Sequence, residues 1–211
     1  MKSKTIVFLL LHFCFIITAY SQVRYGLKTG IQASESADIH FESKMRIPGL
    51  NAGAFASIPL QKKNNFANTD LFLNIELLYS QEGESEGELI GEWYEQSKFI
   101  GNIDYNQDYI NLPVLLRMHI TNHHNIFFET GPQFGYLIYE KNKELDEKFY
   151  GKNNSFNLSV VLGGGFCFGK NCQYEISGRI CWGALDLYPD WIKRNFTATV
   201  GLGFGYIFRS K

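Results

Sequence analysis

The chain has 211 residues, of which 45% are hydrophobic, 16% aromatic and 19% charged, and its formal net charge is −1. A chain that is this apolar and carries so little net charge is not expected to be disordered. It also lacks the excess of basic residues with which nucleic-acid-binding proteins neutralise phosphates, so we expect no nucleic-acid partner. The length fits a single domain, and the aromatic fraction favours strands.

The first 21 residues have the three-part layout of a secretory signal peptide. Lys2 and Lys4 precede an uncharged, apolar stretch over residues 5–19, and Ala19 and Ser21 place small residues before a cut at Gln22. The alternative is a buried helix or a membrane anchor. We expect export, with a cleaved signal peptide at 1–21 and one domain at 22–211. No later stretch has about 18 consecutive apolar residues, so no transmembrane helix is expected.

Eight stretches of the remaining chain alternate between apolar and polar residues, which is the period of a β-strand. These stretches are 23–34, 50–58, 71–80, 110–120, 128–136, 156–163, 173–182 and 196–208. Long connections (35–46, 82–103, 140–154 and 184–194) alternate with shorter ones (61–68, 121–125 and 169–171). Long loops at one end and short turns at the other are typical of outer-membrane barrels, and an even number of strands puts both termini at the short-turn end.

The alternation leaves open which face points inwards. In a soluble, lipocalin-like barrel the apolar face lines a ligand cavity, whereas in a membrane barrel it faces lipid. Ten glycines on the polar face favour the membrane barrel, because a narrow lumen has room only for small residues. They are Gly26, Gly30, Gly53, Gly131, Gly135, Gly163, Gly165, Gly201, Gly203 and Gly205.

Aromatic residues near the strand ends are expected to form girdles at the membrane interfaces. They include Tyr25, Tyr79, Tyr136, Trp182 and Phe208. We therefore predict an all-β fold, a single eight-stranded antiparallel up-and-down transmembrane β-barrel.

Charges of both signs lie on the predicted inner face. They are Arg24, Lys28, Glu76, Arg117, Glu129, Glu175 and Arg179. Charges buried in a narrow lumen are tolerable only when they are paired, so we expect a lumen charge network that plugs the barrel. The alternative is a conductance pathway lined by charge. Whether these charges are mutually paired discriminates between the two.

Several stretches together resemble one family, the small outer-membrane β-barrel proteins of Bacteroidetes, known as porin-family or PorT-like proteins. They are YGLKTGIQ (25–32), GLNAGAFASIPL (49–60), IELLYSQEG (75–83), DYINLPVLLRMHI (108–120), FETGPQFGYLI (128–138), SFNLSVVLGGGFCFG (155–169) and GLGFGYIF (201–208). The resemblance covers nearly the whole mature chain. It implies a barrel fold and an outer-membrane location, and it implies no single activity.

Two features near the end of the chain leave alternatives open. Phe208 resembles the terminal aromatic of a barrel-assembly signal, and it also fits a plain interfacial aromatic. Cys167 and Cys172 flank a turn and are candidates for a disulfide, although their strand parities are opposite. Cys181 leaves an odd number of cysteines after residue 21, which is not a disulfide framework.

No motif for catalysis or cofactor binding survives inspection. The glycine-rich stretches at 163–165 and 201–205 do not open a helix, as a phosphate-binding loop requires. His119, His123 and His124 do not share one face of a strand, so we expect no metal site there. The stretch 82–95 contains six glutamates, which we interpret as a solvated loop rather than a Ca²⁺ site. Trp93, Tyr94 and Phe99, in or near this stretch, could form an adhesive patch.

We expect no enzyme and no cofactor. The first functional hypothesis is a structural or interaction barrel with a plugged lumen that binds an extracellular or envelope protein. Outer-membrane lipid, and the barrel-assembly machinery during insertion, are its other expected partners, and both termini are expected in the periplasm. The second hypothesis is a narrow porin-like channel for small solutes. A third is an outer-membrane hydrolase, for which His119 is the only histidine within a predicted strand.

Overall fold

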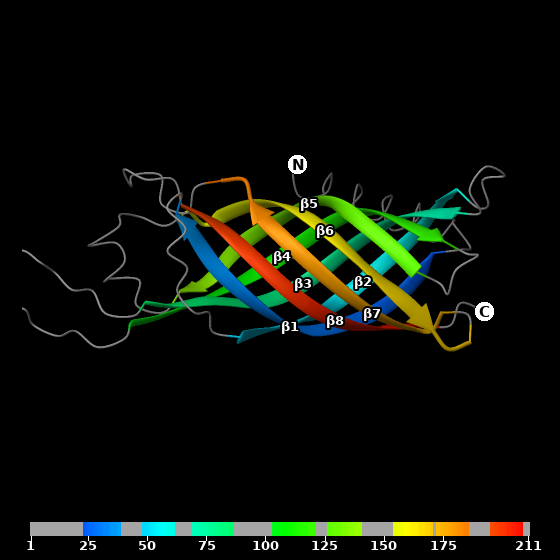
Figure 1. Ribbon diagram of the computed structural model, residues 1–211, viewed down its shortest axis with the longest axis horizontal. Coiled ribbons are helices and arrows are strands. Elements are labelled where there is room, and N and C mark those ends of the chain that lie inside the picture. The colour runs from blue at the N-terminus through cyan, green and yellow to red at the C-terminus, as the bar shows by residue number, and fades with distance from the viewer. Residues whose placement is uncertain are drawn as a thin grey trace, which may run out of the picture.

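In the computed structural model, eight strands form one closed barrel in which each strand pairs with its neighbours in the chain (Figure 1). The residues described are 23–38, 48–61, 69–86, 103–120, 126–140, 154–170, 172–185 and 195–208. The strands are β1 (Arg24–Asp38), β2 (Pro48–Gln61), β3 (Thr69–Glu86), β4 (Ile103–Ile120), β5 (Ile126–Glu140), β6 (Phe156–Phe168), β7 (Tyr174–Gly183) and β8 (Asn195–Ile207). No helix in these ranges is long and apolar enough to cross a membrane.

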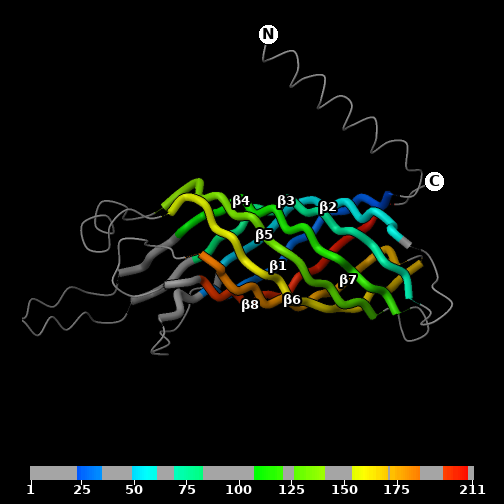
Figure 2. Tube along the Cα trace, turned by 90° about the horizontal axis from the view of Figure 1, so that it is seen from above, coloured from blue at the N-terminus to red at the C-terminus, as the bar shows by residue number. Residues whose placement is uncertain are grey.

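All neighbouring strands are antiparallel, and β1 closes the barrel by pairing with β8, for example Leu27 with Tyr206. The predicted all-β, up-and-down barrel of eight strands is thus confirmed. We call the end at which β1 begins and β8 ends the turn end, and the opposite end the loop end. Figure 2 shows the barrel from a second side, with strands that tilt strongly against its long axis.

Several strands are longer at the loop end than the sequence predicts, among them β1, which ends at Asp38, and β5, which ends at Glu140, and the difference is largest for β3 and β4. β3 continues to Glu86 and β4 begins at Ile103, and the two remain paired from Gln81–Asp108 to Glu86–Ile103. The predicted connection over 82–103 is therefore too long. Apolar alternation marks a strand only where one face is apolar, and this polar hairpin extension is held by backbone hydrogen bonds without that signal.

The apolar face points outwards, as the glycines on the other face indicate. Leu202 is 62% exposed and Ile31 56%, whereas the inward-facing Phe127 and Tyr109 are fully buried. This is the reverse of a soluble globular domain, in which a large contiguous apolar surface is rare. The outer surface therefore requires an apolar surrounding.

Exposed aromatic side chains gather near both ends of the outer face. Tyr25 and Phe208 lie at the turn end, whereas Tyr136 and Trp182 lie towards the loop end. At the turn end the rings form a ladder across strands, with centroids 5.5 Å apart for Phe168–Tyr174 and for Tyr174–Tyr206, and 5.6 Å apart for Tyr206–Phe208. The remaining predicted girdle residue, Tyr79, is partly buried and donates a hydrogen bond to Asp108 Oδ2 at 2.8 Å.

The space taken by inward-facing glycines predicts a difference between two substitutions. A Cβ atom at Gly165 would collide with the carbonyl oxygen of Ile176 and lie 2.7 Å from Phe127 Cζ. At Gly178, on the outer face, it would meet only Leu202 Cδ2, at 3.8 Å. We expect Gly165→Ala to lower the free energy of unfolding by about 2 kcal/mol and Gly178→Ala to leave it nearly unchanged. Urea unfolding in detergent micelles checks this, and equal effects would refute the face assignment.

Candidate functional site

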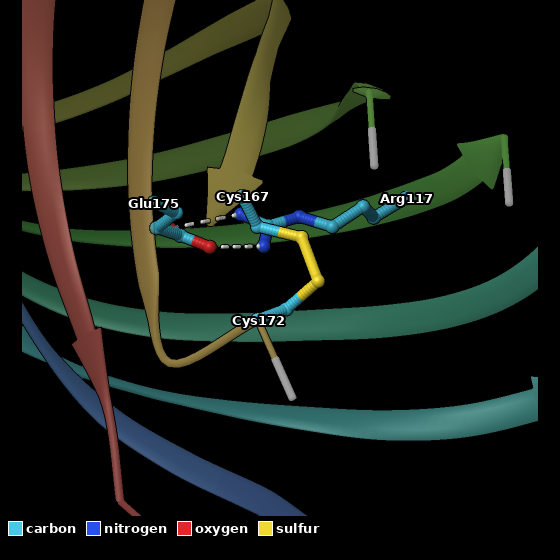
Figure 3. The surroundings of a disulfide bond; sticks show 4 residues. All are labelled: Arg117, Cys167, Cys172 and Glu175. Carbon is cyan, nitrogen blue, oxygen red and sulfur yellow. Dashed lines mark hydrogen bonds and ion pairs between the residues drawn. A yellow bond between two sulfur atoms is a disulfide. The ribbon is translucent and has the colours of Figure 1, made fainter. Parts of the chain in front are cut away.

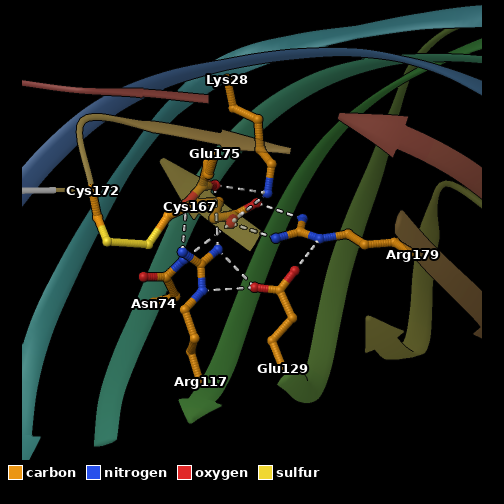
Figure 4. Close-up of polar contacts among 9 residues, drawn as sticks. Lys28, Asn74, Arg117, Glu129, Cys167, Cys172, Glu175 and Arg179 are labelled. Carbon is orange, nitrogen blue, oxygen red and sulfur yellow. Dashed lines mark hydrogen bonds and ion pairs between the residues drawn. A yellow bond between two sulfur atoms is a disulfide. The ribbon is translucent and has the colours of Figure 1, made fainter. Parts of the chain in front are cut away.

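Six charged side chains from five strands meet inside the barrel (Figure 4). They are Lys28 on β1, Glu76 on β3, Arg117 on β4, Glu129 on β5, and Glu175 and Arg179 on β7. Each stands on the inward-facing side of its strand, because side chains alternate between the two faces. Six of the seven charges predicted to lie in the lumen are thus brought together.

The six charges alternate in sign around a closed ring, hereafter the charge ring. Arg117 contacts Glu129 and Glu175, each with a nitrogen–oxygen distance of 2.7 Å. Arg179 contacts Glu129 on one side, and on the other it donates to both carboxylate oxygens of Glu76, at 2.6 Å each.

Lys28 closes the charge ring between the two remaining carboxylates. Its Nζ lies 3.5 Å from Glu76 Oε1 and 3.5 Å from Glu175 Oε1. Every acid therefore has two basic neighbours, and every base has two acidic neighbours. Three positive and three negative charges leave the charge ring with no net charge.

The charge ring is almost completely removed from water. Its side chains are 0–3% exposed, apart from Arg179 at 12%. A single buried charge costs several kcal/mol, whereas neutralised and hydrogen-bonded charges are tolerated. The pairing is therefore a condition for placing these side chains inside the barrel.

Arg24 does not belong to the charge ring, and the prediction that grouped it with the other six needs correction. Its guanidinium lies over the ring of Phe72, 5.2 Å from the centroid, at the start of β1 near the turn end. Arg24 and Lys28 share a face but are four residues apart, which is about 13 Å along a strand. The alternation of side chains along a strand shows which of them point into the barrel, but it does not fix their positions along the barrel axis.

A layer of aromatic side chains lies on the turn-end side of the charge ring. Phe55, Phe72 and Phe127 are buried at 4%, 3% and 0% exposure. His119 packs against Phe72 and Phe127, with ring centroids 5.1 and 5.4 Å away. The guanidinium of Arg117 lies over Phe127 at 4.2 Å, which joins this layer to the charge ring.

A disulfide bond between Cys167 and Cys172 lies beside the charge ring at the turn end (Figure 3). Cys167 faces inwards opposite Glu175 in the register of β6 and β7. Cys172 lies in the turn with φ of 54°, in the left-handed region that a non-glycine residue rarely adopts. The opposite parities of the two cysteines therefore do not prevent pairing, because Cys172 is not a strand residue. Cys181 is a free thiol on β7.

Sequence reasoning missed Asn74 as a member of the buried polar network. Its Nδ2 donates to Glu76 Oε1 at 3.3 Å, and its side chain is fully buried. Asn74 lies two residues before Glu76, so the same alternation that placed Glu76 inside could have identified it. The aromatic layer shares this signal, since Phe72 and Phe127 stand on the polar face of their strands.

The remaining sequence motifs lie within strands or outside the described residues. The glycine-rich stretches lie within β6 and β8, and neither opens a helix. Glu82 is buried on β3, and Glu84 and Glu86 extend that strand, whereas the rest of the acidic stretch lies outside the described residues, as do His123 and His124. Within the described ranges no group of three or more His, Cys, Asp or Glu side chains is arranged to hold a metal ion.

The ring of His119, the histidine of the hydrolase hypothesis, packs against Phe72 and Phe127.

Residues 18–188 match a family whose description is outer membrane protein beta-barrel domain. Among solved structures, the chain is similar to Ail, the attachment invasion locus protein of Yersinia pestis, in complex with the heparin analogue sucrose octasulfate. The identity is 16%, the match covers 88% of this chain and 99% of that chain, and the TM-score is 0.46. Neisserial surface protein A is similar at 8% identity, with 87% of this chain and 97% of that chain covered and a TM-score of 0.48. No curated protein matches the chain.

The charge ring predicts that neutralising one of its bases is costly. Arg117→Met removes the shared neighbour of Glu129 and Glu175 and leaves two buried carboxylates with excess negative charge. We expect a loss of about 3–5 kcal/mol in the free energy of unfolding, measured by guanidinium titration in micelles. Arg24→Met is the matched control, with an expected loss below about 1 kcal/mol. Equal losses would contradict the special position of Arg117.

The disulfide predicts a definite thiol count and a modest stability effect. Alkylation of the denatured, unreduced protein, followed by peptide mapping, should label Cys181 and leave Cys167 and Cys172 unlabelled until a reductant is added. The double variant Cys167→Ser/Cys172→Ser should unfold with about 2 kcal/mol less free energy, because the loop it opens is short. Labelling of all three thiols before reduction would show that the bond is absent.

Proposed function

The chain belongs to the family of outer membrane protein beta-barrel domains, and from this premise we propose that it is a barrel with a plugged lumen that acts through its loop end. In this proposal a signal peptide directs export, both termini lie in the periplasm, and the long connections face the cell exterior. The protein is neither an enzyme nor a channel. Its partners are outer-membrane lipid, the assembly machinery during insertion, which reads Phe208, and a protein bound by the loops or by the periplasmic turns.

The observation that carries the proposal is the mutual pairing of the lumen charges. A conductance pathway needs charges that are free to meet a passing ion, whereas every member of the charge ring is held by two neighbours of opposite sign. Eight-stranded barrels have interiors that side chains can fill. The buried Phe72 and Phe127 on the turn-end side support the same interpretation.

Structural differences between the two ends of the barrel support binding at the loop end. The turn from β6 to β7 is short and fastened by the disulfide, whereas β3 and β4 carry a hairpin beyond their pairing with β2 and β5. Loops on a rigid scaffold are where binding residues are commonly placed. The acidic residues Glu84 and Glu86 of this extension, which lie beyond the buried Glu82 in the sequence, favour a partner with basic groups.

Planar-bilayer conductance of the folded, inserted protein tests the plug. We expect the wild-type protein to give no steady single-channel steps. Arg117→Ala and Glu129→Ala each break the charge ring and should produce measurable current, because they leave space and unpaired charge in the lumen. Heat-modified mobility in gels verifies that each variant is folded. Steady steps from the wild-type protein that change on these substitutions would refute the plug and support the narrow channel.

A further inference from the structure

A small cavity of about 40 Å³ lies next to the charge ring. Lys28 and Arg179 belong to both, and most of the other walls come from inward-facing residues nearer the loop end, among them Gln32, Glu82 and Cys181. The aromatic layer lies on the opposite, turn-end side of the charge ring. With the lumen plugged on the turn-end side, a ligand would reach the cavity from the loop end.

Two buried polar groups on the cavity wall have unused hydrogen-bonding capacity. Lys28 Nζ and Ser177 Oγ have no hydrogen-bond partner among the described residues, and Lys28 and Ser177 are only 4% and 2% exposed. The 3.5 Å contacts of Lys28 with its two glutamates neutralise its charge but are too long for good hydrogen bonds. A buried, unsatisfied donor is costly, so this position favours an oxygen acceptor.

Glycine makes the space between these two groups. A Cβ atom at Gly203 would lie 3.0 Å from Ser177 Oγ and 3.2 Å from Lys28 Cε. Any larger residue on this part of β8 would therefore occupy the place where Lys28 and Ser177 converge. Gly203 therefore leaves space beside the two hydrogen-bond donors, Lys28 Nζ and Ser177 Oγ.

The opposite polarity is supplied by Glu82. Its side chain is buried at 8% exposure and receives one hydrogen bond, from Asn111 Nδ2 to Oε1 at 3.2 Å. A carboxyl group can accept more than one hydrogen bond, so acceptor capacity is left at this wall. The cavity therefore presents donors at Lys28 and Ser177 and an acceptor at Glu82.

The net charge of a ligand decides whether it can be buried in this cavity. The charge ring is neutral as it stands, and burial favours the neutral form of the Glu82 carboxyl group, which accepts its hydrogen bond from the uncharged Asn111. A charged ligand of either sign would therefore bring an uncompensated charge into the cavity. Burying an uncompensated charge is strongly unfavourable. An uncharged polar group avoids this cost.

We propose that this cavity is a binding site for a small uncharged amide or hydroxyl group that enters from the loop end. Its oxygen accepts hydrogen bonds from Lys28 Nζ and Ser177 Oγ, and the rest of the ligand points along the cavity towards its loop end, where Glu82 lies. A volume of about 40 Å³ corresponds to roughly three water molecules, which suits a ligand of about four heavy atoms. The proposal rests on the plugged lumen, because an open lumen would leave no closed floor.

Acetamide and acetate test the site directly, because they have the same shape and differ in charge. We titrate each, carbon-13-labelled, into the folded protein in micelles and measure line broadening. Acetamide should bind in a saturable way, and acetate at least about tenfold more weakly, which corresponds to about 1.4 kcal/mol. Ser177→Ala should weaken acetamide binding about fivefold by removing one hydrogen bond.

Ser57→Ala is the matched control, since Ser57 is also buried on the inner face but does not line the cavity. It should leave acetamide binding unchanged. As a second readout, saturating acetamide should slow the reaction of the Cys181 thiol with methyl methanethiosulfonate in the wild-type protein. Equal binding of acetamide and acetate, no saturable binding of either, or no effect of Ser177→Ala would each overturn the proposal. If these results come from a barrel that gives no conductance, the binding site fails and the plug stands.

Discussion

The interior of this barrel depends on the mutual neutralisation of six buried charges. A lumen enclosed by eight strands cannot supply enough water to solvate three acids and three bases, so each must be solvated by the others. The closed alternation of Lys28, Glu175, Arg117, Glu129, Arg179 and Glu76 achieves this with no charge left over. The members come from five of the eight strands, so the charge ring also ties together segments that are far apart in the chain.

This constraint divides the lumen into two unequal parts. On the turn-end side of the charge ring, the barrel is filled by Phe55, Phe72 and Phe127. The disulfide fastens the turn between β6 and β7 at the same end. On the loop-end side, polar side chains and glycines leave a small cavity. This asymmetry supports the proposal that the barrel is closed towards one side of the membrane and acts towards the other.

The sequence predicts the fold well because a membrane barrel needs one apolar face along every strand. That requirement leaves a period-two signal in all eight strands, and the small residues opposite reveal which face is inside, as Gly165 illustrates. The signal ends where the apolar surrounding ends, and so the β3–β4 extension at Glu86 and Ile103 was missed. The number of strands and the positions of the short connections can be predicted from local sequence alone.

The candidate site was predicted less completely, for geometric reasons. Parity correctly placed Arg117 and Glu129 inside, but the height of a side chain depends on the tilt and stagger of the strands, which local sequence does not encode. Arg24 was therefore grouped with charges that lie farther along the barrel. Parity also has no meaning in a turn, where Cys172 adopts a left-handed backbone and reaches Cys167.

A double-mutant cycle across Arg179 and Glu76 measures the central claim, that pairing rather than the individual charges stabilises the lumen. The free energies of unfolding of the wild-type protein, Arg179→Met, Glu76→Gln and the double variant are compared in micelles. We predict a coupling energy of about 2–3 kcal/mol, with the double variant more stable than the sum of the single losses implies. Additive losses, with a coupling energy near zero, would contradict this account.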